Sequence, residues 1–272
     1  MKPVSKTAYY CCGVRMTDAR SAKPLINDTY AERLMGEEGL LVWEPFKNHP
    51  NPNGSNIARC FIIDTWIKEQ IELNPQTTVI LIGAGLDSRA YRIDGGSWIE
   101  LDEPGIIEYK EMLLPSRQCR NPLQRISIDF EKEKLDSHLA PFTHLGPVLF
   151  VVEGVLMYLS LEQRKELLDV LTRLFKTHIL MCDLMNAEFF ERLGRRGIYV
   201  ELKKMNALFK DPMNNPQQLM LDAGYKLEEA KSNLVTASDH GLLTIPRFLV
   251  KWLMKKFFMG YSTYRFRFGL DR

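Results

Sequence analysis

Two glycines that directly follow an apolar run are the first residues of this chain whose spacing points to chemistry. Val79-Ile-Leu-Ile82 lacks polar alternation, as expected of a parallel strand covered on both faces, and Gly83-Ala-Gly85 follows it. Glycines at this place allow a tight turn whose backbone can approach a ligand without interference from a Cβ atom. Gly-x-Gly taken alone is also compatible with a plain turn. The chemistry it indicates is the binding of a nucleotide-like ligand.

An acid at the end of the next apolar stretch supports this interpretation. Trp98-Ile-Glu-Leu-Asp102 ends in an aspartate, at the point where a doubly wound fold places a carboxylate on the ribose hydroxyls. An ionised carboxylate can accept both hydroxyl protons of a ribose. The alternative role for Asp102 is a helix cap or a turn. We predict that Asp102, together with Gly83 and Gly85, binds the nucleoside part of a cofactor.

The third glycine of the dinucleotide fingerprint is replaced by Ser88, so the pattern is Gly83-x-Gly85-x-x-Ser88. In dinucleotide-binding proteins that glycine permits close packing of the helix beside the pyrophosphate. Its replacement argues against a nicotinamide or flavin cofactor. It favours a smaller adenosine-containing ligand without phosphates, of which S-adenosylmethionine is the obvious example.

The segment Gly83-Ala-Gly-Leu-Asp-Ser-Arg-Ala-Tyr-Arg92 resembles the signature of the leucine carboxyl methyltransferase family, which includes tetracenomycin-type polyketide O-methyltransferases. Further matching segments occur in the family's order and at its approximate spacings, namely Ala58–Asp64, Glu100–Pro104, Ser127–Phe130 and Val152–Leu159. The resemblance covers residues from roughly 7 to 185. It implies a class I Rossmann-like α/β fold with a mostly parallel, doubly wound seven-stranded sheet, N-terminal helices, a helical lid insertion and S-adenosylmethionine as cofactor.

Two more acids follow apolar stretches. Asp129 ends Arg125-Ile-Ser-Ile-Asp129, where its carboxylate could accept a hydrogen bond from the adenine amino group while Phe130 packs near the base. The resemblance gives this position the same role, and the alternative is a plain aspartate at the end of a strand. Glu153 follows Val148-Leu-Phe-Val-Val152. In the family that it resembles, the equivalent glutamate lies at the cofactor, near its aminium or sulfonium group.

Three further residues are candidates for the methionine or acceptor side. Arg59 precedes the first strand on an expected helix, and its guanidinium suits a bidentate contact with the methionine carboxylate. The resemblance implies that role, whereas the alternative is a solvated helix arginine. Arg15 is a weaker candidate for a cofactor or substrate carboxylate. Tyr158 could point into the cavity, although packing is as common a role. We assign Arg15 and Tyr158 to the catalytic side, and expect Asp87 and Arg89 to brace the turn.

Composition and charge exclude several classes of protein. Of 272 residues, 45% are hydrophobic and 26% charged, which are ordinary globular values, and the net charge of +2 indicates no general attraction to nucleic acid or membranes. Residues 241–272 differ, because seven basic residues stand against Asp271 alone, giving 7 − 1 = +6. The stretch Phe248–Phe258 could contact a membrane surface or an acidic substrate. We favour the alternative of an amphipathic helix that packs on the fold with solvated lysines.

No metal site is expected, because the five cysteines form no Cys-x-x-Cys pair and the five histidines show no ligand spacing. The scattered cysteines suggest reduced thiols in a cytoplasmic protein. Met1-Lys-Pro-Val-Ser5 is not followed by the apolar region of a secretory signal, and no run has the length needed to span a bilayer.

The expected elements form one domain over residues 1–272. It comprises an N-terminal helical segment (1–75), a cofactor-binding core (76–185), a lid or connecting segment (186–240) and a closing helix and strand (241–272). Within it we expect a loop at 44–56, a helix at 57–73, and strands near 78–82, 97–101, 125–128, 147–152, 178–183 and 260–268. Ser160 and Gln163 form a capping box before a helix that continues to Phe175.

The predicted activity is an S-adenosylmethionine-dependent O-methyl transfer to a carboxylate or hydroxyl of a small molecule. A carboxylate acceptor needs no dedicated base, whereas a phenol or alcohol needs some deprotonation. A protein C-terminal carboxyl methyltransferase is the close alternative. A nicotinamide-dependent oxidoreductase and a cofactor-binding scaffold without turnover are the alternatives from other classes.

Overall fold

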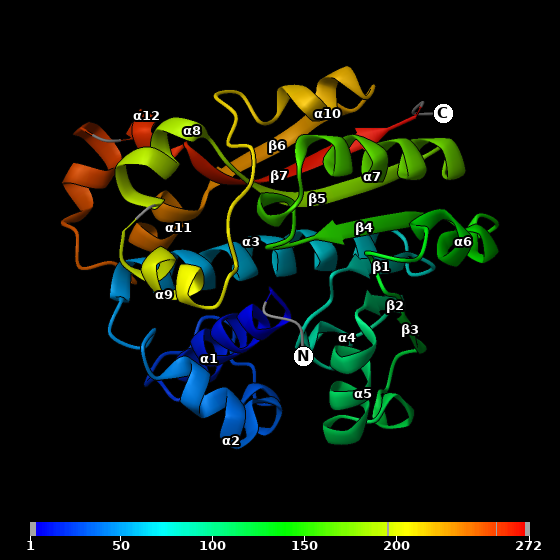
Figure 1. The fold of residues 1–272 in the computed structure, drawn as a ribbon, viewed down its shortest axis with the longest axis horizontal. Coiled ribbons are helices and arrows are strands. Elements are labelled where there is room, and N and C mark those ends of the chain that lie inside the picture. Colours follow the sequence, from blue (N-terminus) through cyan, green and yellow to red (C-terminus); the bar gives the residue numbers. More distant parts are fainter. Residues whose placement is uncertain (1–3, 195, 254, 270–272) are drawn as a thin grey trace.

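Seven strands form one sheet in the order β3-β2-β1-β4-β5-β7-β6 (Figure 1). The computed structural model describes residues 4–194, 196–253 and 255–269. Strands β1 to β5 are parallel, and β7 is antiparallel to both of its neighbours. The strands are β1 (Thr78–Ile82), β2 (Ser97–Asp102), β3 (Leu123–Ser127), β4 (Val148–Val152), β5 (His178–Met185), β6 (Lys226–Ser232) and β7 (Tyr261–Phe268). The predicted mostly parallel, seven-stranded α/β fold is confirmed.

Helices cover both faces of the sheet because side chains of β1 alternate between two cores. Ile80 and Ile82 belong to a cluster with Leu171 of α7, whereas Val79 and Leu81 pack in a second cluster with α3. The main helices are α1 (Thr7–Ala19), α2 (Ala31–Trp43), α3 (Pro50–Leu73), α4 (Arg89–Arg92), α5 (Pro104–Leu113), α6 (Leu135–Leu139) and α7 (Leu161–Leu174). They are followed by α8 (Ala187–Phe189), α9 (Ile198–Lys204), α10 (Gln218–Asp222), α11 (Asn233–Asp239) and α12 (Lys255–Phe258), with π-helical turns at Phe190–Gly194 and Leu249–Leu253.

The N-terminal helices form a third core beside the carboxyl edge of the sheet. Tyr9 and Val14 of α1 pack with Leu34 of α2 and with Leu86 of the turn after β1. A Cβ atom built on Gly85 would lie 3.2 Å from the Cβ of Ala8. Helix α1 therefore lies directly against the glycine turn.

The structure differs from the expected elements at two places. The segment expected as a loop over 44–56 becomes helical at Pro50. Proline is tolerated there because the first N–H groups of a helix have no hydrogen-bond partner within the helix, so the missing N–H of proline costs nothing. The segment 186–240 is not a lid throughout, because β6 extends the sheet beside β7 within it. Helix α7 begins as predicted, with Ser160 and Gln163 forming a capping box. No helix in the described part of the chain is long and apolar enough to cross a membrane.

Candidate active site

The carboxyl ends of the parallel strands bring the predicted turn and acids to one edge of the sheet. Gly83 and Gly85 adopt φ values of +72° and +50°, which favour glycine. A Cβ atom on Gly83 would lie 2.5 Å from Cγ2 of Val155, in the segment after β4. The N–H groups of Gly83 and Ala84 donate to the carbonyl of Leu101 at 2.9 and 3.1 Å, which joins the turn to β2.

Asp102 is buried at this edge and is bonded by backbone groups. Its Oδ2 accepts from the N–H of Gly85 at 2.6 Å, and its Oδ1 accepts from the N–H of Glu103 at 2.7 Å. Burial raises its pKa to about 6, although these two backbone donors act in the opposite direction. Among the described residues Asp102 forms no ion pair, and each carboxylate oxygen has a further lone pair. The carboxylate can therefore accept hydrogen bonds from a ligand.

Arg59 is buried in α3 and contacts four side chains on neighbouring elements. Its Nε donates to Oε1 of Glu153 at 2.8 Å, and its Nη1 donates to Oδ2 of Asp183 at 3.1 Å and to the hydroxyl of Tyr261 at 2.8 Å. Its Nη2 contacts the sulfur of Cys11 at 3.5 Å. Two of the three guanidinium nitrogens are thus engaged by acids, and Nη2 is the nitrogen best placed to take a ligand carboxylate.

Glu153 joins Arg59 to a second buried arginine. Its Oε2 pairs with Nη1 of Arg89 at 2.7 Å, and Nε of Arg89 pairs with Oδ1 of Asp64 at 2.5 Å. Burial alone would raise the pKa of Glu153, but the guanidinium groups of Arg89 and Arg59 hold it below its ordinary value. Arg89 also pairs with Asp87 in the turn, which keeps the pKa of Asp87 at about 2 against the effect of burial. Glu153 is therefore an anion at neutral pH.

Arg15 ties α1 to the glycine turn. Its Nε pairs with Oδ2 of Asp28 at 2.8 Å, and its Nη2 donates to the carbonyl of Leu86 at 2.6 Å. The carboxylate that Arg15 contacts in this structure is that of Asp28, and its assignment to the catalytic side stays a prediction.

Tyr158 follows β4 and is half-buried, with its ring edge-to-face against Phe209 at 5.4 Å between centroids. Burial raises the pKa of the Tyr158 hydroxyl above its ordinary value. Near neutral pH a phenol of this kind donates a hydrogen bond and does not act as a base. Its assignment to the catalytic side stays a prediction.

Asp129 and Phe130 lie in the loop after β3, beside Asp102. The N–H of Ile128 donates to the carbonyl of Asp102 at 2.9 Å, which holds this loop against the end of β2. Oδ1 of Asp129 accepts from the N–H of Glu131 at 3.1 Å, and Oδ2 pairs with Lys132 at 3.1 Å. Phe130 is 38% exposed, so its ring is accessible for packing against a base.

The sequence interpretation missed Asp183 and Tyr261. Oδ1 of Asp183 accepts from the N–H of Gly154 at 2.6 Å, and its Oδ2 accepts from the hydroxyl of Tyr261 at 2.9 Å. Asp183 thus fixes both the turn after β4 and Nη1 of Arg59. The signal for Asp183 was an acid inside the apolar run of β5, whereas Tyr261 differs in no way from other residues of an alternating strand.

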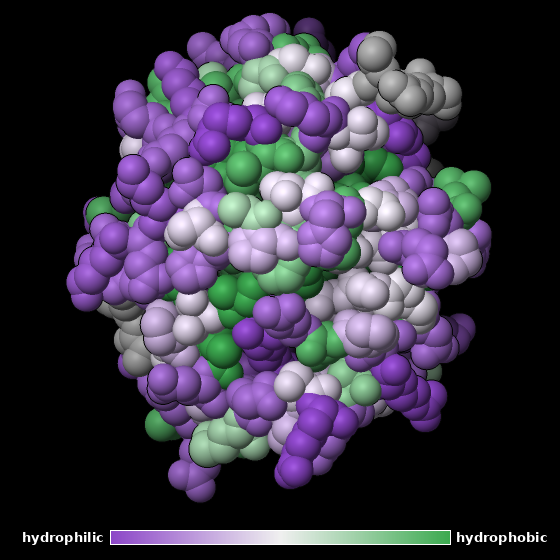
Figure 2. Space-filling view, turned by 90° about the vertical axis from the view of Figure 1, so that its right-hand side faces the viewer, coloured by the Kyte–Doolittle hydropathy of each residue, from purple (hydrophilic) through white to green (hydrophobic). Residues whose placement is uncertain are grey.

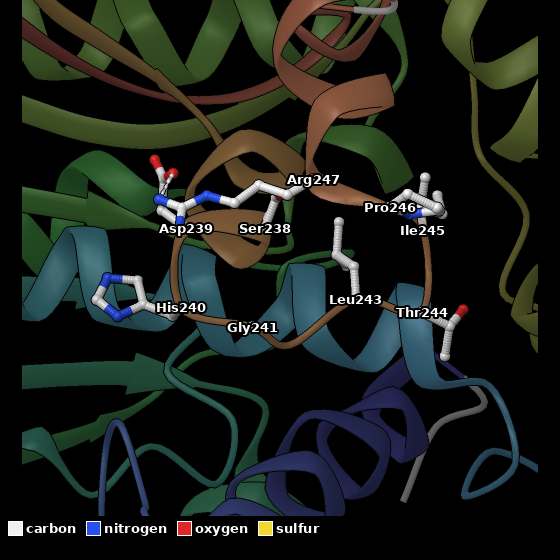
Figure 3. A pocket seen from close by; sticks show the side chains of 9 residues that line it. All are labelled: Ser238, Asp239, His240, Gly241, Leu243, Thr244, Ile245, Pro246 and Arg247. Carbon is white, nitrogen blue, oxygen red and sulfur yellow. Dashed lines mark hydrogen bonds and ion pairs between the residues drawn. The ribbon is translucent and has the colours of Figure 1, made fainter.

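Asp183 also lines a small cavity of about 40 Å³. Its wall is mostly apolar and includes Met185, Phe190, Phe209 and Met213. A larger hollow of about 570 Å³ is formed by residues 238–247 (Figure 3). The predicted site residues do not line this hollow, which lies beside α11 and over α3. Within the described ranges, no group of three or more metal-ligating side chains is found.

Comparison with known proteins identifies a family and several relatives that this chain resembles. The family model for leucine carboxyl methyltransferase matches residues 8–172. Two proteins of Mycobacteroides abscessus, both provisionally named S-adenosyl-L-methionine-dependent methyltransferases, are 26% and 30% identical over 62% and 63% of this chain. A Streptomyces coelicolor protein with the same provisional name is 27% identical over 63% of the chain. The chain spans 60 to 63% of the length of these relatives.

Two solved structures share the fold at low sequence identity. A DUF574 family protein from Streptomyces avermitilis has a TM-score of 0.58 and 13% identity, covering 92% of this chain and 99% of the other. A protein from Thermobifida fusca, provisionally named a methyltransferase, has a TM-score of 0.56 and 13% identity, covering 89% and 93% of the two chains. These likenesses support the seven-stranded fold.

Proposed function

Because this chain belongs to the leucine carboxyl methyltransferase family, we propose that it is an S-adenosylmethionine-dependent O-methyltransferase acting on a carboxylate or hydroxyl of a small molecule. The observation that carries the proposal is the pairing of a glycine turn with positive φ angles and a buried Asp102 that accepts hydrogen bonds from two backbone N–H groups. Such a carboxylate keeps acceptor capacity for a ribose diol.

The residues present fit the cofactor. Asp102 would hold the ribose, and the accessible ring of Phe130 with Asp129 would hold the adenine. The methionine carboxylate would approach Nη2 of Arg59, since Nε and Nη1 already contact Glu153 and Asp183. Glu153 lies at the same edge as an anion that can balance the cationic aminium or sulfonium region. S-adenosylmethionine supplies an electrophilic methyl group on a sulfonium.

The protein's contribution to the reaction is orientation and exclusion of water. Asp183 and Tyr261 hold Arg59 in one position, and Arg89 holds Glu153, so the charged groups at the methionine end are fixed before binding. Helix α1 lies against the glycine turn and would help to exclude water from a bound cofactor. The Tyr158 hydroxyl, kept protonated by its raised pKa, would donate a hydrogen bond to an acceptor oxygen.

We prefer a small acceptor to a protein tail because aromatic side chains of the segment after β5 occupy this end of the site. The rings of Phe190 and Phe209 pack at 5.4 Å between centroids and, with Asp183, belong to the wall of the small cavity. Incubation with labelled S-adenosylmethionine and panels of small carboxylic acids, phenols and protein C-termini tests this choice. Methylation of a protein tail, with no small acceptor modified, would replace the first proposal by the protein carboxyl methyltransferase.

Calorimetry with S-adenosylhomocysteine tests the cofactor site. Asp102→Ala removes the ribose acceptor and should weaken binding by about 10- to 100-fold. Asp94→Ala is the matched control, because Asp94 is an exposed aspartate in the turn after α4. Unchanged affinity in a folded Asp102→Ala protein would remove Asp102 from the site. Thermal stabilisation by a nicotinamide dinucleotide but not by S-adenosylhomocysteine would support the oxidoreductase alternative.

A further inference from the structure

Basic residues are concentrated in two segments that surround the carboxyl edge of the sheet. Residues 192–204 and 247–258 together carry nine basic residues and one acid, giving 9 − 1 = +8, while the whole chain has a net charge of +2. We call these two segments the cationic end. Including the adjoining acids Glu188, Glu191 and Asp239 still leaves 8 − 3 = +5. Arg195 and Met254 lie outside the described residues.

Contacts of aromatic rings join the two segments to each other and to Phe189 and Phe190, which directly precede the first segment. The rings of Phe189 and Phe257 lie 5.5 Å apart, and the guanidinium of Arg192 lies 5.7 Å from the centre of the Phe257 ring. Phe190 packs edge-to-face on Tyr199 of α9 at 5.1 Å. Figure 1 shows α8, α9 and α12 at the left end of the molecule, which is the end toward which the parallel strands point.

The cationic end also exposes large apolar side chains. Trp252 is 86% exposed and Phe248 is 61% exposed, whereas Val250 between them is fully buried. Val200 of α9 is 48% exposed. The sequence interpretation expected an amphipathic helix packed on the fold, and this holds for Val250 and Phe258, which enter a core cluster. It does not hold for Trp252 and Phe248, whose rings remain exposed to water in the folded protein.

Not every cation of this end is available to a partner. Figure 3 shows Arg247 reaching across the hollow to Asp239, and the two groups pair at 3.0 Å. Arg192 pairs with Glu188 at 3.1 Å, and Lys204 with Glu201 at 2.9 Å. Lys256 is exposed beside the aromatic pair of α12. The opposite end of the molecule, shown in Figure 2, presents hydrophobic residues only as small patches separated by hydrophilic side chains.

We propose that the cationic end binds the surface of an anionic lipid bilayer, with Trp252 and Phe248 entering the headgroup region. Aromatic side chains favour the boundary between headgroups and acyl chains, and neighbouring lysines and arginines are attracted to anionic lipids. An exposed apolar pair within a segment that is rich in basic residues meets both requirements. The proposal is independent of the methyl-transfer reaction, and it would place the carboxyl edge of the sheet toward the membrane.

Tryptophan fluorescence gives a direct test, because the other three tryptophans are buried. Trp43, Trp66 and Trp98 are 5%, 0% and 1% exposed, so a change in emission reports on Trp252. Titration with vesicles of equal parts phosphatidylserine and phosphatidylcholine should shift the emission to shorter wavelength. Vesicles of phosphatidylcholine alone should give a much weaker response, and added salt should weaken binding to the anionic vesicles.

Paired variants distinguish vesicle binding through the cationic end from nonspecific adsorption of the protein. Phe248→Ala and Lys256→Glu should each weaken vesicle binding by about tenfold. Leu73→Ala, at the 78% exposed end of α3, and Lys165→Glu, exposed on α7, should leave it unchanged. The absence of a shift with anionic vesicles, or equal losses in the control variants, would overturn the proposal. A concentration-dependent dimer that buries Trp252, or a response to nucleic acid but not to vesicles, would also overturn it.

Discussion

Asp102 is the residue at which burial most directly sets the chemistry of the proposed site. Its pKa of about 6 lies well above that of a free aspartate because it is buried, with its two backbone donors only partly compensating. Accepting two ribose hydroxyls requires the ionised form. Cofactor affinity should therefore be full above about pH 7 and fall as the pH drops through 6.

Calorimetric titration with S-adenosylhomocysteine between pH 8 and 5 checks this expectation. At pH 5 about a tenth of a carboxyl with this pKa is ionised, so affinity should fall about tenfold from its plateau. Asp102→Asn cannot titrate and should bind weakly with a flat profile over this range. A tenfold fall that persists in Asp102→Asn would assign the titration to another group.

At the residue scale, sequence could predict those members of the site whose roles are set locally. Gly83, Gly85 and Asp102 are identified by a strand that ends beside them, and their contacts lie within or just beyond that turn. Asp183 and Tyr261 contact Arg59 from 124 and 202 positions away. Only the strand order, with β7 beside β5, brings these groups together, and no local pattern encodes that pairing.

At the scale of elements, the start of α7 depends on one reciprocal cap. The side chain of Ser160 accepts from the N–H of Gln163, whose side chain accepts from the N–H of Ser160 at 2.8 Å. Ser160→Ala removes one acceptor and should lower the free energy of unfolding by about 1 kcal/mol. Urea denaturation measures the change. Ser160→Asp keeps an acceptor and should remain close to the parent, and equal losses in both variants would show that the cap is not the cause.

Strands could be predicted from sequence where buried apolar residues follow one another without interruption. Strands β1 and β4 are buried at every position and appear as unbroken apolar runs. Strand β6 was missed because it is an edge strand that pairs with β7 alone, carries charges, and leaves Leu227 45% exposed. The start of α3 was missed because prolines and asparagines typical of loops are also tolerated in a first helical turn.

At the scale of the whole molecule, buried ion pairs join elements that are distant in sequence. Four buried arginines, Arg15, Arg59, Arg89 and Arg92, pair with acids from the loop before α2, from α3 and β5, and from the turns after β1 and β4. These contacts lower the pKa values of Asp64, Asp87 and Glu153, against burial. A carboxyl group whose pKa is lowered by folding stabilises the fold at pH values above its pKa in the unfolded chain, which is near 4. That contribution is lost as the pH falls further. Acid unfolding should therefore be steep below about pH 4.

Between pH 6 and 4 two other buried groups act in opposite directions. His178 bonds the Tyr225 hydroxyl at 2.7 Å, and burial lowers its pKa to about 4, so the unfolded chain takes up a proton that the folded protein does not. Asp102, with its pKa raised to about 6, does the reverse, because the folded protein takes up the proton first. Their contributions to the slope of stability against pH nearly cancel over this range.

Asp102→Asn should remove one side of this balance. Each uncompensated proton changes the free energy of unfolding by about 1.4 kcal/mol per pH unit. Because Asp102 is half protonated in the folded protein at pH 6, and the unfolded chain also takes up this proton near pH 4, the variant should lose about 2 kcal/mol between pH 6 and 4 relative to the parent. Urea denaturation of both proteins without cofactor, at matched ionic strength, gives the free energy of unfolding at each pH. The two proteins are compared by its slope against pH, which is unaffected by any pH-independent change in stability that the substitution causes. Parallel curves would mean that Asp102 is not protonated in the folded apoprotein at pH 5. The pH dependence of cofactor affinity would then need another titrating group, so this stability measurement also tests the binding prediction without using any ligand.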